Sequence, residues 1–115
     1  MNKIISEHIN ELFDSYDLFG GKAEKCIYIP LKSRFPEVSE DDISELKAYL
    51  KGFFQYCVKY ADIIAEKYNT PFLLHNEEAK KEISDYVKKC QEQYPEIDEK
   101  HITDFFSIVC WLANR

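Results

Sequence analysis

The chain has 115 residues, a length that suits one domain with its own hydrophobic core. Its 21 acidic and 15 basic side chains give a formal net charge of −6, which disfavours binding to nucleic-acid phosphates and to anionic membranes. No segment approaches the roughly 18 consecutive apolar residues of a membrane-spanning helix, and the first residues lack the apolar run of a secretory signal. We therefore expect a single folded domain over residues 1–115, located in the cytoplasm.

The first element is an amphipathic helix. Apolar residues recur every three to four positions from Ile4 to Tyr16, with polar residues between them. The glycines Gly20 and Gly21 follow this pattern and favour the end of a helix. We predict a helix over about residues 3–18.

The segment over residues 22–34 is ambiguous. Its Cys-Ile-Tyr-Ile run suits a strand, because β-branched and aromatic residues are enriched in strands. Pro30 biases Ile29, the residue before it, away from the helical region of backbone conformation. We predict a short helix here, or two short turns broken near Pro30.

The next segment carries the strongest helical signal in the chain. Apolar residues follow an unbroken alternation of three and four positions, and further apolar residues run along both sides of this stripe. The stripe consists of Ile43, Leu46, Leu50, Phe53, Cys57, Tyr60 and Ile64. A face this wide is typical of a helix with neighbours on two sides rather than of a two-stranded coiled coil. The pattern predicts a long central helix over about residues 40–68.

Two more helices complete the predicted fold. Residues 69–71, Asn-Thr-Pro, end the central helix, and Asn76 is a good N-cap for a helix over about 77–93. A last helix, over about 99–113, is apolar on nearly every side, which suits a buried helix or one that covers another chain. We thus predict an all-α bundle of four to five helices, and a homodimer through the last helix would use Phe105, Phe106 and Trp111.

An internal repeat marks two of the helix starts. The stretch FPEVSEDDI at residues 35–43 returns 59 residues later as YPEIDEKHI at residues 94–102. In both copies the proline favours an extended residue before it and so ends the preceding helix. Each copy therefore predicts a helix, an aromatic-Pro corner and a second helix.

Each corner also carries helix-capping signals. Ser39 and Asp98 are good N-caps, and Asp42 lies where a capping box places its acidic residue, although Asp is shorter than the usual Glu. Two apolar pairs have the spacing of a hydrophobic staple, namely Val38 with Ile43 and Ile97 with Ile102. These local roles account for the repeat in full, and a duplicated binding unit stays the alternative.

The sequence contains no recognisable catalytic or metal-binding motif. Its four cysteines, Cys26, Cys57, Cys90 and Cys110, lack close metal-ligand spacing, and three of them fall on apolar helix stripes. Buried reduced thiols are the expected state, with one disulfide pair as the alternative. No Glu-x-x-His motif of a di-iron bundle and no glycine-rich phosphate loop occur. We expect no enzyme activity, no cofactor and no metal.

The acidic charge and the eight tyrosines favour a protein-binding module, such as an inhibitor, an immunity or anti-defence protein, or an adaptor. A basic partner would be steered toward an acidic surface. The predicted contact residues are Glu40, Asp41, Asp42, Glu45, Tyr49 and Tyr56. A purely structural interpretation stays open, in which these acids form a solvated helix cap and these tyrosines form the margin of the core.

A second class is a helical transcription-associated or nucleic-acid-binding protein, dimeric through the last helix. A recognition helix should present basic or amide side chains at its exposed start. The candidate helices open instead with Glu40-Asp41-Asp42 and with Glu99-Lys100-His101. Nucleic acid is therefore the less favoured partner.

Overall fold

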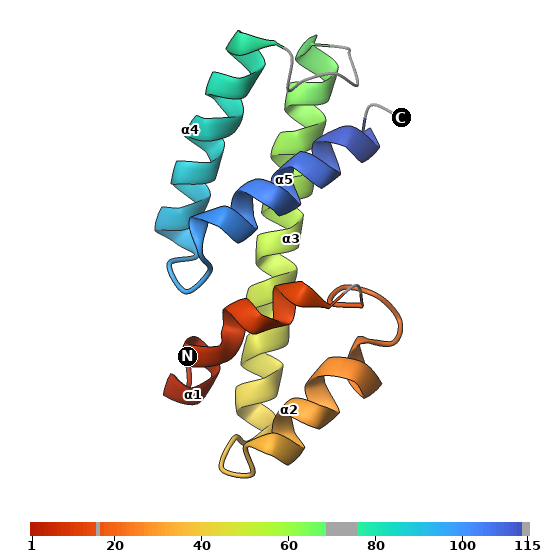
Figure 1. Cartoon of the computed structure of the whole chain (residues 1–115), viewed down its shortest axis with the longest axis vertical. Helices are drawn as coiled ribbons and strands as arrows, with labels where there is room; N and C mark the ends of the chain where they lie inside the picture. The colour runs from red at the N-terminus through yellow and green to blue at the C-terminus, as the bar shows by residue number, and fades with distance from the viewer. Residues whose placement is uncertain (16, 69–75, 114–115) are drawn as a thin grey trace. The chain divides into compact units, whose positions relative to one another are not determined.

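The computed structural model describes residues 1–15, 17–68 and 76–113, and no β-strand occurs among them (Figure 1). Five α-helices are present: α1 (Lys3–His8), α2 (Ile29–Arg34), α3 (Glu40–Tyr68), α4 (Glu77–Gln93) and α5 (Glu99–Ala113). A 3₁₀-helix, η1 (Ile9–Asp14), continues α1, and a π-helix, η2 (Glu24–Tyr28), leads directly into α2. The predicted all-α fold with a long helix at 40–68 is confirmed.

Contacts along the chain divide it into two compact units: unit 1, Met1–Gly52, and unit 2, Phe53–Arg115. The boundary falls inside α3, so the first half of this helix belongs to unit 1 and the second half to unit 2. The expectation of a single domain stays a prediction.

In unit 1, η2 and α2 pack against the first half of α3. Lys47 of α3 forms an ion pair with Glu24 of η2, and its ammonium group lies 4.9 Å from the ring centroid of Tyr28. A buried apolar core lies beneath these contacts and includes Ile5, Ile9, Ile27, Leu31, Val38, Ile43, Leu46 and Leu50.

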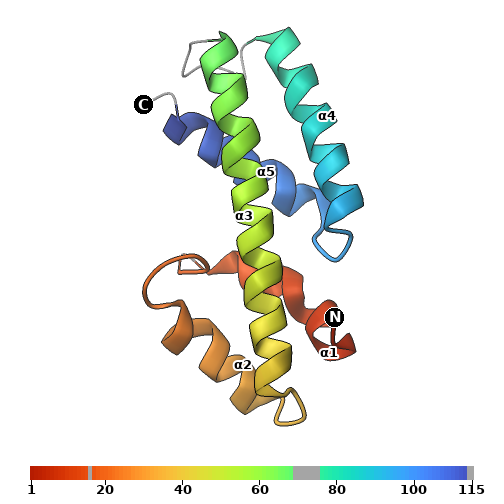
Figure 2. The same ribbon diagram turned by 180° about the vertical axis from the view of Figure 1, so that it is seen from behind.

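In unit 2, α4 and α5 pack on the second half of α3, as Figure 2 shows from behind. The ring of Phe53 on α3 lies 5.3 Å from that of Phe105 on α5, and the Tyr56 hydroxyl donates to the Tyr86 carbonyl of α4. The core includes Phe53, Cys57, Ala61, Ile64, Ala79, Ile83, Val87, Cys90, Ile97, Ile102 and Phe106.

The first helix is shorter than the predicted 3–18. The α-helical backbone ends at His8, whose φ of −114° and ψ of −2° precede the 3₁₀-turns of η1, and Ser15 is already extended. In a 3₁₀-helix, residues three apart lie directly above one another. His8 and Glu11 have this spacing, and His8 Nδ1 lies within hydrogen-bond distance of Glu11 Oε1, at 3.1 Å. Tyr16, the last predicted apolar position, lies outside the described residues.

The prediction that Pro30 moves Ile29 out of the helical region is wrong. Ile29 has φ −65° and ψ −48°, so the segment 24–34 is helical throughout, in agreement with the predicted short helix and not with two turns broken near Pro30. The Ile29 N–H donates to the Glu24 carbonyl, five residues back, in a π-helical turn. Pro30 then lies in the first turn of α2, the part of an α-helix that tolerates proline best.

The two aromatic-Pro corners have nearly identical backbones. Phe35 has φ −125° and ψ 80°, and Tyr94 has φ −124° and ψ 65°. Each corner makes the same three backbone hydrogen bonds from an N–H group to a carbonyl oxygen. In the first corner they run from Phe35 to Leu31, from Val38 to Phe35 and from Ile43 to Ser39. In the second they run from Tyr94 to Cys90, from Ile97 to Tyr94 and from Ile102 to Asp98. The staple residues Val38, Ile43, Ile97 and Ile102 are all 4% exposed or less. The predicted helix-corner-helix repeat is therefore present in three dimensions.

The bounds of the three longer helices match the prediction at 40–68, 77–93 and 99–113. Asn76 caps α4 as expected, because its side-chain oxygen accepts from the N–H groups of Glu78 and Ala79 at 3.0 and 3.1 Å. The predicted stop at residues 69–71 lies outside the described residues.

Candidate functional site

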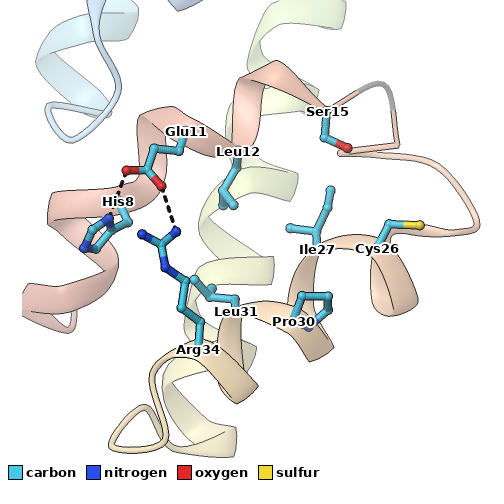
Figure 3. Close-up of a pocket in the computed structure, with 9 residues that line it drawn as sticks. All are labelled: His8, Glu11, Leu12, Ser15, Cys26, Ile27, Pro30, Leu31 and Arg34. Atoms are coloured by element: carbon cyan, nitrogen blue, oxygen red, sulfur yellow. Dashed lines mark hydrogen bonds and ion pairs between the residues drawn. The ribbon is translucent and has the colours of Figure 1, made fainter.

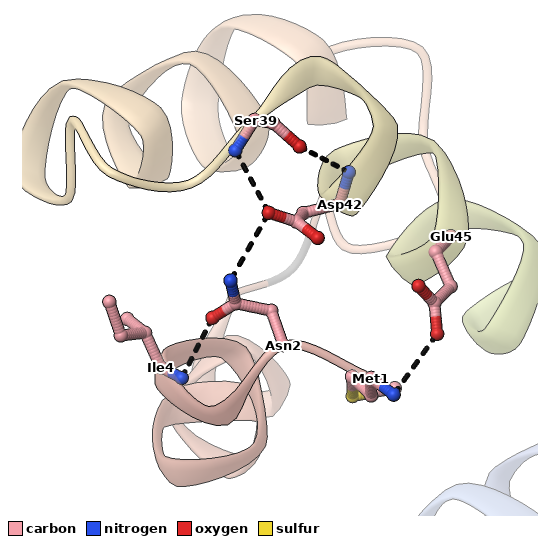
Figure 4. A network of polar contacts seen from close by, with 6 residues as sticks. All are labelled: Met1, Asn2, Ile4, Ser39, Asp42 and Glu45. Atoms are coloured by element: carbon pink, nitrogen blue, oxygen red, sulfur yellow. Dashed lines mark hydrogen bonds and ion pairs between the residues drawn. The ribbon is translucent and has the colours of Figure 1, made fainter.

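The predicted site at the start of α3 begins with a capping box (Figure 4). The Asp42 N–H donates to the Ser39 hydroxyl oxygen at 3.1 Å, and the Asp42 carboxylate accepts from the Ser39 N–H at 3.0 Å. The same carboxylate oxygen also accepts from the Asn2 side-chain amide at 3.1 Å. These hydrogen bonds hold the pKa of Asp42 below its ordinary value of 3.8, and the bond from the Ser39 backbone N–H contributes most.

Two more of the predicted acids have partners within unit 1. Glu40 forms an ion pair with Lys32 of α2, and the hydrogen bond from Lys32 lowers the pKa of Glu40. Glu45 lies 3.1 Å from the amino nitrogen of Met1 (Figure 4). Asp41 is exposed. The negative charge of this helix start is thus partly balanced by neighbouring cations in the same unit.

The two predicted tyrosines fall in different units. Tyr49 is half-buried in unit 1. Tyr56 is half-buried in unit 2, where its hydroxyl donates to the Tyr86 carbonyl at 3.4 Å. Burial raises the pKa of Tyr56 to about 12. Tyr56 thus belongs to the packing of α3 on α4, and the assignment of all six residues to partner binding stays a prediction.

Tyr56 belongs to an aromatic cluster between α3 and α4. Ring centroids are 4.6 Å apart for Tyr56 and Tyr60, 4.7 Å for Tyr60 and Tyr86, and 6.3 Å for Tyr56 and Tyr94. The ammonium group of Lys89 lies 5.8 Å from the Tyr86 centroid. The sequence shows Tyr56 and Tyr60 one helical turn apart, but their pairing with Tyr86 depends on how the two helices pack.

The last helix has one buried and one exposed apolar side. Phe106 is fully buried, whereas Ile108, Trp111 and Leu112 are 57%, 52% and 48% exposed. The spacing of these three residues, three and four positions apart, places them on one side of the helix. We call Ile108, Trp111 and Leu112 the α5 outer face. Of the residues predicted for a dimer contact, Trp111 lies on this face, Phe105 packs against Phe53 and Phe54 at 5.3 and 5.7 Å, and Phe106 lies in the core.

Three of the four thiols are buried as expected. Cys57, Cys90 and Cys110 lie in the core of unit 2, and a hydrogen bond with Cys90 together with burial raises the pKa of Cys57. Burial also raises the pKa of Cys110, to about 12. Such thiols are poor nucleophiles because the thiolate is disfavoured. Cys26, by contrast, is exposed, and all four cysteines are free.

Within residues 1–15, 17–68 and 76–113, no group of three or more histidine, cysteine or acidic side chains is arranged to hold a metal ion. The same part of the chain contains no helix that is both long and apolar enough to cross a bilayer. Comparison of the chain with protein-family models, with curated proteins and with solved structures gave no match in any of the three.

Proposed function

We propose that the chain is a small protein-binding module, of the inhibitor, immunity or adaptor kind, that acts by occupying its partner without catalysis. The observation that supports this most is the α5 outer face. Trp111 is 52% exposed, with Ile108 and Leu112 beside it on the same side of the helix. Exposed apolar groups of this kind are typical of interaction sites, and tryptophan often dominates the binding energy when it enters a partner's pocket.

The chemistry of the surroundings favours a basic partner. The chain carries a net charge of −6, and the exposed Asp104 lies one helical turn before Ile108. An apolar pocket with a positively charged rim would therefore complement both the ring of Trp111 and the carboxylate of Asp104. We expect the partner to present such a pocket.

The acidic start of α3 has a lesser role in this proposal. Lys32, Asn2 and the Met1 amino group already engage Glu40, Asp42 and Glu45. We expect these acids, with Asp41, to act through charge that increases the association rate. Direct contact with the partner would centre on the α5 outer face.

The test is affinity capture from the native cell, followed by binding measurements with the purified partner. Trp111→Ala should weaken binding at least about thirtyfold, the effect expected of a tryptophan at the centre of an interface. Ile29→Ala is the matched control, because Ile29 is 53% exposed and lies in unit 1. This control should change the affinity by less than about threefold.

Capture of the same proteins in the same amounts by wild type and Trp111→Ala would contradict the proposal. A second copy of this chain is the alternative occupant of the α5 outer face, since the predicted homodimer uses the same helix. Sedimentation equilibrium distinguishes the two, because a self-associating chain would form dimers that Trp111→Ala dissociates. The charge of −6 on each copy opposes such a dimer.

A further inference from the structure

Unit 1 contains a pocket that the proposed function does not use. The pocket lies between α1–η1 and η2–α2 and has a volume of about 230 Å³ (Figure 3). Leu12, Ile27 and Leu31 form its apolar wall, while His8, Glu11 and Arg34 gather at one end. This volume equals that of roughly seven or eight liquid waters, so it suits a ligand the size of an amino-acid side chain.

The charged end of the pocket is an ordered triad. Glu11 Oε1 lies 3.1 Å from His8 Nδ1, and Glu11 Oε2 lies 3.3 Å from Arg34 Nη1. Both carboxylate oxygens of Glu11 are thus engaged, and the hydrogen bond with His8 lowers the pKa of Glu11. Arg34 bonds through one of its five N–H groups and His8 through one of its two ring nitrogens. Donor capacity therefore remains at this end of the pocket.

Phe35 holds two members of the triad in place. Its ring centroid lies 4.6 Å from that of His8, and the Arg34 guanidinium carbon lies 4.9 Å from the same ring. Phe35 is itself fixed by the first aromatic-Pro corner, where its N–H donates to the Leu31 carbonyl. A side chain stacked on a ring loses less conformational freedom when a ligand binds. The corner thus organises the polar end of the pocket beforehand.

We propose that this pocket binds a small carboxylate that carries a short branched alkyl chain of about five or six carbons. The planar guanidinium of Arg34, whose remaining N–H groups match the two oxygens of a carboxylate, would bind the acid group. The wall of Leu12, Ile27 and Leu31 would bury the alkyl chain. A cationic ligand is disfavoured because Glu11 is already paired with two basic side chains.

The test titrates the full chain with 4-methylpentanoate and follows backbone amide signals by NMR. Two probes serve as controls: 4-methylpentanamide, which has the same shape without the charge, and acetate, which lacks the alkyl chain. The carboxylate should shift signals around the pocket in a saturable manner, with an affinity on the order of millimolar. Both controls should bind at least about tenfold more weakly. Equal binding of acid and amide would overturn the proposal.

Cys26 provides an independent measurement, because it lines the same pocket and is exposed, whereas the other three cysteines are buried. Bound 4-methylpentanoate should slow the alkylation of Cys26 by iodoacetamide, whereas the amide at the same concentration should not. An alkylation rate that is unchanged at a carboxylate concentration that saturates the NMR shifts would place the ligand elsewhere and overturn the proposal.

A matched pair of variants tests the role of Arg34. Arg34→Gln should weaken binding of the acid at least about tenfold. Lys32→Gln removes a charge from the same helix, but Lys32 pairs with Glu40 and does not line the pocket. This control should bind within about twofold of wild type, and an equal loss in both variants would contradict the proposal. If Arg34→Gln does not fold, the comparison of acid with amide on the wild-type chain still decides the matter.

Discussion

The two aromatic-Pro corners give the same backbone turn but lead into helices of very different exposure. Phe35 and Tyr94 differ by 1° in φ and 15° in ψ, from −125° and 80° to −124° and 65°. Eighteen residues after each, the first copy has Phe53, which is fully buried, and the second has Leu112, which is 48% exposed. The corner pattern therefore sets the local path of the chain, while later packing decides which side chains are covered.

The neighbours of the second helix differ between the two copies. α3 continues to Tyr68 and has packing neighbours in both units, and most of its apolar residues are covered, although Ile63 is 43% exposed. α5 has 15 residues, and its outer side remains accessible at Ile108 and Trp111. Repetition of a folding signal thus created two equivalent helix starts and one exposed apolar face.

The largest expected effect is on the free energy of unfolding, and it compares the buried side of α5 with its exposed side. Phe106→Ala should lower the free energy of unfolding by about 3–5 kcal/mol, because it opens a cavity in the core of unit 2. Trp111→Ala should cost less, about 1–2 kcal/mol, since about half of the side chain is exposed. Urea denaturation monitored by circular dichroism measures both. Comparable losses in the two variants would mean that the α5 outer face is covered in the folded protein.

These two residues also show what the sequence could and could not predict. The bounds of α3, α4 and α5 follow from local signals, namely caps, prolines and apolar periodicity. The same periodicity makes α5 apolar on nearly every side, so it does not tell which of Phe106 and Trp111 lies inside. Burial depends on the position of α3 and α4, which local patterns do not specify.

The pocket of unit 1 escaped prediction for a similar reason. His8 and Glu11 are three residues apart, a spacing that brings side chains together in an α-helix as well as in a 3₁₀-helix. Arg34 joins them from a segment 23 residues away. The spacing of His8 and Glu11 was visible in the sequence, whereas the π-turn before Pro30 and the approach of α2 were not.

A smaller effect tests whether the two corners are capped equally well. Ser39→Ala removes the hydroxyl that accepts from the Asp42 N–H and should cost about 1 kcal/mol in the free energy of unfolding. Asp98→Ala changes the corresponding position of the second corner and should cost a similar amount, about 1 kcal/mol. Chemical denaturation of both variants beside wild type measures the two costs.

Equal losses at Ser39 and Asp98 would show that the corners are equivalent in energy as well as in backbone geometry. The second corner has His101 at the position that corresponds to Asp42. A loss at Ser39 alone would therefore show that the capping energy comes from the capping box of the first corner. Either result refines the comparison, and no loss at either position would contradict the role of both caps.

The smallest expected effect is on how the stability of the protein depends on pH in the acidic range. Hydrogen bonds from Ser39 and Asn2 hold the pKa of Asp42 below its ordinary value of 3.8, so the folded state favours the ionised carboxylate. Its contribution to stability is complete above the ordinary value and is lost as the pH falls through the lower, folded value. Wild type should therefore lose stability more steeply than Asp42→Asn between about pH 5 and pH 2.

Thermal unfolding at several pH values measures this slope, with Asp41→Asn as the control. Asp41 lies in the same first turn but takes no part in the capping box, so its variant should follow the steeper wild-type curve. The second corner has no carboxylate at the position of Asp42 and contributes nothing of this kind to the difference. Identical slopes for wild type and Asp42→Asn would mean that the charge of Asp42 does not strengthen the first corner. The two corners would then differ only in the helices that they begin.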